Sequence, residues 1–109
     1  MVVVSELNGV RTASVVGDLD LSNAQAIRES LETAAEDRDK FVVSFERCGY
    51  CDSSGIAILV ALQHRLGDGL AVVVPPEAQL RRILSIVGID RVMRIASSVE
   101  EAIAELAAA

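Results

Sequence analysis

Two short apolar runs constrain the fold of this chain most strongly. Residues 41–45 and residues 70–74 are nearly continuous in apolar side chains, and each run ends at polar or turn-forming residues. A strand that alternates apolar and polar residues buries one face, whereas a continuous apolar run indicates a strand that is covered on both faces. Such strands are typical of parallel sheets, so the two runs favour an α/β fold.

Helical patterns alternate with these strands. Apolar residues recur at a spacing of three and four in four separate stretches, and the second of these is expected to form a helix over residues 53–66. Ser22 and Ser98 are predicted to cap the first and last helices, because Gln25 and Glu101 stand three residues further on as capping-box partners.

The remaining strands complete an α/β domain. Strands are expected over residues 2–5 and 10–16, and the Asn-Gly dipeptide at positions 8–9 between them is a strong hairpin signal. A short last strand is expected over residues 92–95. The order β-β-α-β-α-β-α-β-α predicts a mixed, largely parallel sheet of about five strands, with an N-terminal antiparallel hairpin and four helices. Residues 1–109 are expected to form a single domain.

Composition and charge narrow the class of partner. Hydrophobic residues make up 51% of the chain and charged residues 24%, a balance that argues against disorder. The net charge of −6 and the absence of tryptophan argue against nucleic acid as a partner, and an acidic domain suits a basic protein surface. The longest apolar run, residues 55–62, is far shorter than the roughly 20 residues of a membrane span. We therefore expect a cytoplasmic protein that has no membrane partner.

Two loops are expected to meet at one edge of the sheet. Right-handed crossovers make the strands before the first and second helices parallel, so the loops 17–20 and 47–53 leave from the same edge. Ligand and partner sites in open α/β sheets favour this edge. Asp20 and Ser53 are therefore predicted to lie close together in space.

Ser53 stands where the second helix is expected to begin, which leaves two interpretations of its side chain. Asp and Ser are preferred helix caps, and a cap contributes about 1 kcal/mol. However, Asp52, Ser53 and Ser54 are three capping candidates where one suffices, which frees a hydroxyl for another role. Gly55 is expected only to ease the tight turn.

The second helix is apolar nearly all round. At 100° per residue, one apolar stripe can cover the sheet, and the following residues fall outside it: Ile56, Ala57, Val60 and Ala61. These side chains are either buried under a neighbouring helix or form a docking patch for a partner protein or a second copy of the chain.

The segment Cys51-Asp52-Ser53-Ser54-Gly55-Ile56 follows an apolar strand and opens a helix. In that place it resembles the signature of the STAS domain family, and more narrowly that of the anti-sigma factor antagonists of bacterial partner-switching systems. Residues 17–20 resemble the G-x-L-D segment of the same family, and the element order matches over nearly the whole chain. The chain departs from the pattern at residues 47–51, which are more polar than usual, and at Ala57, where Gly is common.

The resemblance implies a regulatory mechanism. In that family the unmodified antagonist binds an anti-sigma factor, which is also a serine kinase, and so releases the sigma factor that drives transcription. The kinase phosphorylates the serine after the motif aspartate, here Ser53, and a serine phosphatase restores the active form. The expected neighbours of the phosphoacceptor are Asp20, Asp52, Ser54 and Gly55. The expected partner contacts are Asp20, Ile56, Ala57, Val60 and Ala61.

The sequence leaves two alternatives to this function. The chain is either an antagonist or a STAS accessory subunit of a lipid transporter or a sensory complex. Cys48 and Cys51 have the spacing of a redox motif, which leaves a redox protein as a further alternative. A hydrolytic enzyme is not expected, because His64 lies about 16 Å from Ser53 along the helix, beyond the reach of a general base. No cofactor or metal is expected, because a zinc site needs about four ligands.

Overall fold

The computed structural model describes residues 1–108. The chain forms five strands and four α-helices among these residues, joined in part by two short 3₁₀ turns. The elements are β1 (Val2–Leu7), β2 (Val10–Val15), α1 (Ala24–Ala35), β3 (Phe41–Ser44), α2 (Ser53–Leu66), η1 (Gly67–Gly69), β4 (Leu70–Val73), α3 (Gln79–Ile86), η2 (Ile89–Arg91), β5 (Arg94–Ala96) and α4 (Val99–Ala108).

The strands form one sheet in the order β1-β2-β3-β4-β5. β1 is antiparallel to β2, and the other neighbouring pairs are parallel, which confirms the predicted mixed sheet. The hairpin turn adopts the predicted conformation, since Asn8 and Gly9 have φ angles of 54° and 79°. Positive φ at both central residues is what a type I′ turn requires.

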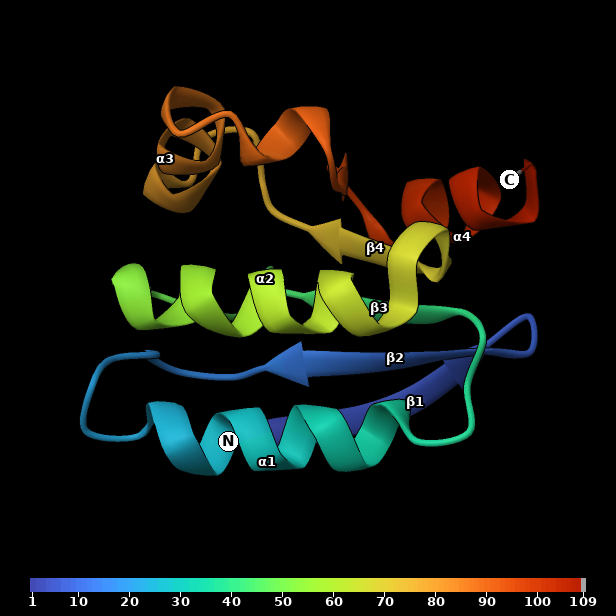
Figure 1. The fold of residues 1–109 in the computed structure, drawn as a ribbon, viewed down its shortest axis with the longest axis horizontal. Helices are drawn as coiled ribbons and strands as arrows, with labels where there is room; N and C mark the ends of the chain where they lie inside the picture. Colours follow the sequence, from blue (N-terminus) through green and yellow to red (C-terminus); the bar gives the residue numbers. More distant parts are fainter. Residues whose placement is uncertain (109) are drawn as a thin grey trace.

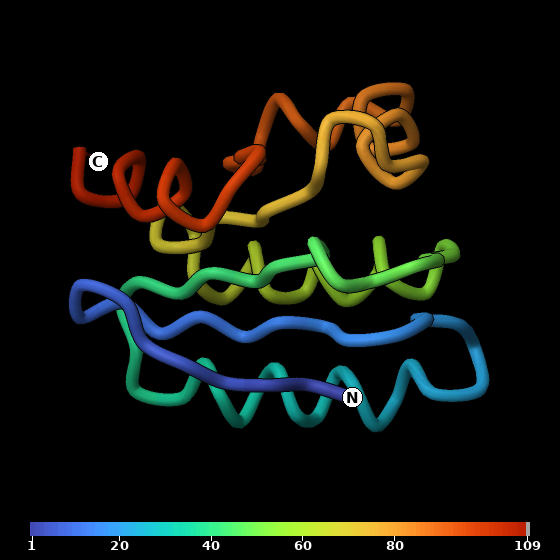
Figure 2. Tube along the Cα trace, turned by 180° about the vertical axis from the view of Figure 1, so that it is seen from behind, coloured from blue at the N-terminus to red at the C-terminus, as the bar shows by residue number. Residues whose placement is uncertain are grey.

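The helices cover the sheet unequally. α1 and α2 lie in front of the strands in Figure 1 and behind them in Figure 2. One core joins this face to α1, α2 and α3, whereas a second, smaller core joins the opposite face to α4. β3 contributes to both, because Phe41 and Val43 lie in the larger core and Val42 in the smaller one, and all three are fully buried. The continuous apolar run is thus a strand covered on both faces.

Two local predictions need correction. Ser22 does not cap α1, because its hydroxyl donates a hydrogen bond to the Asp20 carboxylate and the helix begins one residue later, after Asn23. The Asn23 side chain is itself held by the loop: its amide donates to the Asp18 carbonyl at 2.8 Å. The last strand begins at Arg94 rather than at residue 92, because the turn η2 precedes it.

The last helix begins as predicted. The Glu101 backbone N–H donates to the Ser98 hydroxyl at 3.1 Å, which is one half of the expected capping box. Within residues 1–108, no helix has the length and apolar character that a bilayer crossing requires.

Candidate functional site

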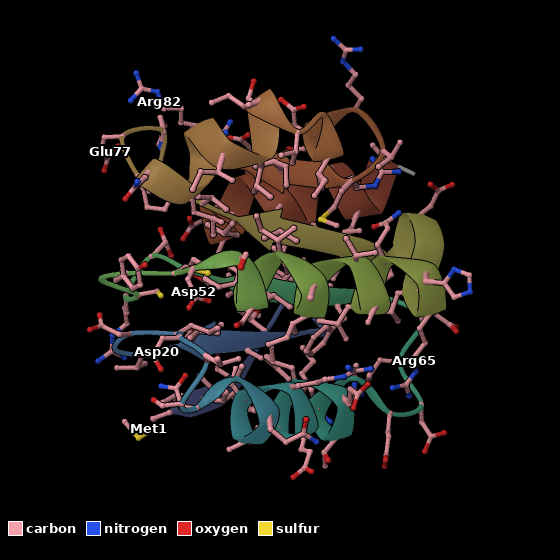
Figure 3. All side chains as sticks on the ribbon, turned by 60° about the vertical axis from the view of Figure 1, so that its left-hand side comes forward. Met1, Asp20, Asp52, Arg65, Glu77 and Arg82 are labelled. Atoms are coloured by element: carbon pink, nitrogen blue, oxygen red, sulfur yellow. The ribbon has the colours of Figure 1, made fainter. Side chains whose placement is uncertain are left out.

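The predicted site is built from two loops that are joined by backbone hydrogen bonds. Leu19 and Cys51 form a parallel bridge, in which the Leu19 N–H donates to the Tyr50 carbonyl at 2.8 Å and the Asp52 N–H donates to the Leu19 carbonyl at 3.2 Å. The Leu19 side chain is fully buried and anchors the bridge in the core. As a result Asp20 and Asp52 emerge at the same edge of the sheet (Figure 3).

Asp52, and not Ser53, caps α2. The Asp52 side chain accepts a hydrogen bond from the Ser54 N–H at 2.8 Å, and Ser53 is the first residue of the helix. Ser53 is exposed, and its hydroxyl makes no side-chain hydrogen bond to any of the residues 1–108. Ser54 is half-buried. The capping interpretation of Ser53 is therefore ruled out, and Ser53 is an exposed residue at the start of the helix.

The outer face of α2 continues from Ser53 along the helix. We define this face as Ser53, Ala57, Val60 and His64, which are all exposed, and the Val60 side chain is 50% exposed. Successive members lie three or four positions apart, so they share one side of the helix.

The two remaining patch residues are only partly open to solvent. Ile56 and Ala61 are half-buried, and Ile56 packs against the main core. The exposed apolar surface is thus narrower than the sequence suggested and centres on Ala57 and Val60.

The charge around Ser53 is negative. The two joined loops carry three carboxylates, those of Asp18, Asp20 and Asp52, against one cation, that of Arg47. Hydrogen bonds to the Asp20 carboxylate, first from the Ser22 hydroxyl and then from the Ser22 N–H, lower the pKa of Asp20 below its usual value. Asp20 is therefore ionised throughout the neutral range, and the edge that presents Ser53 is acidic.

Gly55 has a packing role rather than the turn role that was expected. It is buried in the first turn of α2, where an added Cβ would overlap the Cys51 sulfur and touch the Leu19 side chain. Only glycine allows the loop before the helix to pack this closely against it. Sequence reasoning missed this contact because it depends on how an irregular loop folds back onto the helix.

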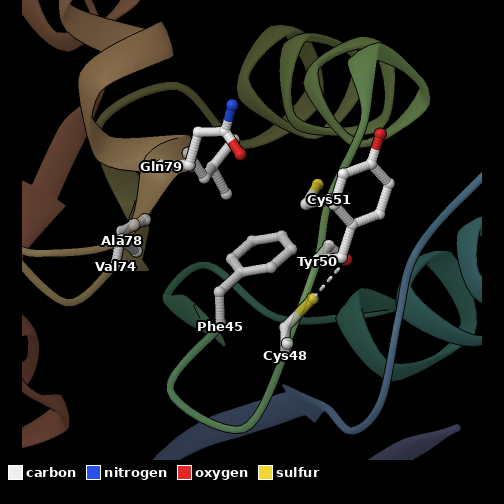
Figure 4. A pocket seen from close by; sticks show the side chains of 9 residues that line it. Phe45, Cys48, Tyr50, Cys51, Val74, Ala78 and Gln79 are labelled. Carbon is white, nitrogen blue, oxygen red and sulfur yellow. Dashed lines mark hydrogen bonds between the residues drawn. The ribbon is translucent and has the colours of Figure 1, made fainter.

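The two cysteines line a small cavity at the same edge. It has a volume of about 90 Å³ and lies between the loop after β3 and the start of α3, with Phe45 and Leu80 among its walls. The Cys48 thiol donates a hydrogen bond to the Tyr50 carbonyl oxygen (Figure 4), with 3.1 Å between sulfur and oxygen. Burial raises the pKa of Cys48 and raises the pKa of Cys51 to about 12. Both thiols are then protonated at neutral pH, the form that is a poor nucleophile, which weighs against a redox motif.

A second feature that the sequence did not reveal is a groove between α1 and α2. Ala24, Gln25 and Arg28 line its α1 side, and Ser54 and Ala57 contribute from α2. The Arg28 guanidinium pairs with Glu32 of the same helix at 3.4 Å, and both side chains are a little under half exposed. Helical periodicity places Arg28 on a polar face but does not indicate which neighbouring helix that face meets.

The fold and the site define a class of protein: a small α/β domain that presents one hydroxyl and a narrow apolar strip at a helix N-terminus. A family model described as "Mlab, STAS domain" matches residues 5–97. The chain belongs to the STAS domain family.

Relatives and solved structures agree with this assignment. The chain is 29% identical over 104 residues to the anti-sigma-F factor antagonist RsfB of Mycobacterium tuberculosis, a match that covers 94% of this chain and 85% of that protein. An anti-sigma factor antagonist from Mycobacterium paratuberculosis superposes with a TM-score of 0.89 at 24% identity, over 98% of this chain and 93% of that one. SpoIIAA of Bacillus in its phosphorylated form superposes with a TM-score of 0.67 at 21% identity, over 97% and 99%. The last two likenesses concern the fold alone.

Proposed function

We propose that this chain is an anti-sigma factor antagonist whose docking surface is the outer face of α2, and whose switch is phosphorylation of Ser53. On this proposal the unmodified chain binds an anti-sigma factor that is also a serine kinase, and so frees a sigma factor for transcription. The single observation that carries the proposal is the exposed Ser53 at the first residue of α2, on the same helix face as the exposed Ala57 and Val60. The name of the relative RsfB supports the same class of function.

Phosphorylation at this position is compatible with the fold. A phosphate adds a charge of about −1.5 to −2. The N-terminus of a helix favours an anion by roughly 0.3–1 kcal/mol, which offsets repulsion from Asp52 and Asp20. Because the Ser53 hydroxyl has no hydrogen-bonding partner in the residues described, its modification breaks no internal contact.

The same phosphate would act strongly on a bound partner. Ser53 lies in line with Val60 on the outer face, so a partner that covers Val60 would bury the added charge or bring it against its own acidic groups. A loss of about 3–4 kcal/mol corresponds to a loss in affinity on the order of 100- to 1,000-fold. One modification is thereby sufficient to release the partner while both proteins stay folded.

Binding measurements test this switch. We expect Ser53→Ala to bind the host's anti-sigma factor kinase as tightly as the unmodified chain, and Ser53→Asp to bind on the order of 100-fold more weakly. Isothermal titration of the kinase with each variant gives the two dissociation constants. Equal affinity of the Ala and Asp variants would remove the electrostatic switch from the proposal.

The modification itself needs a separate control. Ser54 stands next to Ser53 but is half-buried and donates its N–H to Asp52. Incubation with the kinase and ATP is expected to add one phosphate to the wild type and to Ser54→Ala, but none to Ser53→Ala, as measured by intact mass. A phosphate that is lost only in Ser54→Ala would move the acceptor to that residue.

An accessory-subunit role is the second candidate, because the matching family model is described as an Mlab STAS domain and not as an antagonist. Such a subunit would use the outer face of α2 for permanent docking and would need no switch at Ser53. Intact mass of the chain purified from its native host distinguishes the two. Absence of a phosphorylated fraction under all growth conditions would favour the accessory subunit.

A further inference from the structure

β1 is an open edge strand without the usual protection. Within residues 1–108 it pairs only with β2, and β1 is the last strand on that side of the sheet (Figure 2). Five of its six residues are exposed, including Val3, Val4 and Leu7 at 40–48%. Natural edge strands are usually blocked by proline, charged side chains, a bulge or a covering helix. Residues 2–7 contain neither proline nor lysine, and their register with β2 is unbroken. Their one charged side chain, Glu6, is paired with Arg38.

The hydrogen-bond register shows which backbone groups are free. Met1 and Val16 exchange two backbone hydrogen bonds, of 2.8 and 3.2 Å, at the end of the β1–β2 ladder. In an antiparallel ladder, residues that bond to the neighbouring strand alternate with residues that face away from it. Val2, Val4 and Glu6 therefore direct their N–H and C=O groups toward the open edge.

These three residues are symmetric about Val4, which makes the edge complementary to itself. Antiparallel pairing about a two-fold axis at Val4 sets Val4 opposite Val4 of the second copy, and Val2 opposite Glu6. No like charges then face each other, since Glu6 meets a valine and is already paired with Arg38 of its own chain at 2.9 Å. On the other face of the strand, Val3 of one copy lies opposite Ser5 of the second copy.

We propose that a second copy of this chain occupies this edge, so that two β1 strands pair and the two sheets become one sheet of ten strands. The assembly closes at two copies, because the pairing consumes the open edge and the opposite edge strand, β5, has only three residues. The outer face of α2 does not take part, since α2 lies over the middle of the sheet (Figure 1). The proposal is therefore independent of the function proposed above.

The contact is small, so the dimer is expected to be weak and to depend on concentration. A single strand pair lies at the low end of specific interfaces. Each copy carries a charge of −6, so added salt is expected to strengthen the dimer by screening their repulsion.

Sedimentation equilibrium over roughly 10 to 500 µM, a range suited to small interfaces, measures the dimer directly. Val4→Lys and Val4→Glu each place two like charges face to face at the two-fold axis, and each is expected to weaken the dimer by about tenfold or more. An equimolar mixture of the two variants places opposite charges there and is expected to restore association as a heterodimer. That recovery also shows that both variants are folded.

Val60→Lys is the matched control, because Val60 is 50% exposed and Val4 is 48% exposed. This variant makes the same change on the outer face of α2 and is expected to dimerise like the wild type. A wild type that remains monomeric at the highest concentration overturns the proposal. So does a dimer that survives Val4→Lys but is lost in Val60→Lys, which would place the interface on α2.

Discussion

The contact between Gly55 and Cys51 determines how closely the loop before α2 packs against the helix. The Cys51 sulfur lies far inside van der Waals contact distance of the place that the Cβ of any other residue at position 55 would take. Overpacking of this kind costs about 1–3 kcal/mol, because the surrounding side chains and backbone must shift. The start of α2, and with it Ser53, depends on this close approach.

We predict that Gly55→Ala lowers the free energy of unfolding by about 1–3 kcal/mol, and that the loss is much smaller when Cys51→Ala removes the sulfur. Urea denaturation of the two single variants and the double variant measures the coupling between the two positions. If Gly55→Ala costs the same in both backgrounds, the sulfur is not what excludes a Cβ at this position.

The raised pKa of Cys51 also predicts an effect of alkaline pH. Burial raises the pKa of this thiol from 9.0 to about 12 in the folded chain, so the folded state holds the proton where the unfolded state releases it. The resulting stability is fully present below pH 9 and is lost as the pH rises from about 9 to 12. Cys51→Ala should therefore lose less stability over this range than the wild type, as measured by urea midpoints at several pH values.

The sequence predicted the structural roles of some site residues but not of others. The positions of Asp52 and Ser53 at the helix start follow from the motif and the helical period, and the structure confirms that the two loops meet. Reduced, partly buried thiols are one of the two interpretations of Cys48 and Cys51 that the sequence allows, and the structure agrees with it. The packing role of Gly55 did not follow from the sequence, because it depends on contacts within an irregular loop, where no periodicity applies.

At the scale of elements, α2 has the bounds that the sequence predicted, and its N-terminus depends on one side chain. The Asp52 carboxylate satisfies the Ser54 N–H, one of the donors that the first turn leaves without a partner. The Ser53 hydroxyl makes no comparable contact within residues 1–108. Asp52 thus stabilises the start of the helix, whereas the adjacent Ser53 is exposed and has no part in capping.

We predict that Asp52→Ala lowers the free energy of unfolding by about 1 kcal/mol, whereas Ser53→Ala changes it by only a few tenths. Asp52→Asn should keep most of the stability, because asparagine is an equally good cap. Thermal and urea unfolding of the three variants measure these differences. A larger loss for Ser53→Ala than for Asp52→Ala would contradict the assignment of the cap.

The first helix shows why element boundaries are harder to predict than elements. Ser22 and Gln25 have the spacing of a capping box, but the Asp20 carboxylate accepts hydrogen bonds from both the hydroxyl and the N–H of Ser22. A local turn of this kind competes with helix capping for the same side chain. The sequence pattern supports both outcomes, and only the path of the loop selects between them.

At the scale of the whole molecule, the strand order explains the unequal layers. Each parallel strand lies beside the one before it, so the right-handed crossovers all advance in one direction and put α1, α2 and α3 on the same face. The sequence predicted the alternation of strands and helices but not this sequential order, because apolar runs do not specify which strands are neighbours. α4 is left to cover the opposite face alone.

The net charge of the whole molecule acts on a partner before any contact forms. With a charge of −6 and an acidic edge beside Ser53, the chain is expected to attract a basic surface over roughly one Debye length, about 8–10 Å at physiological salt. Attraction at this range speeds the encounter, whereas the lifetime of a complex depends on short-range contacts, such as those proposed above for Val60.

We therefore predict that raising the salt concentration from low to physiological values slows association with the anti-sigma factor kinase severalfold and leaves dissociation nearly unchanged. Ser53→Asp is expected to dissociate faster than the wild type at every salt concentration, because its added charge acts within the interface. Stopped-flow or surface-based kinetics at three salt concentrations separates the two rate constants. An association rate that does not change with salt would mean that the acidic edge contributes nothing at long range, and that the selectivity for the partner resides entirely in the outer face of α2.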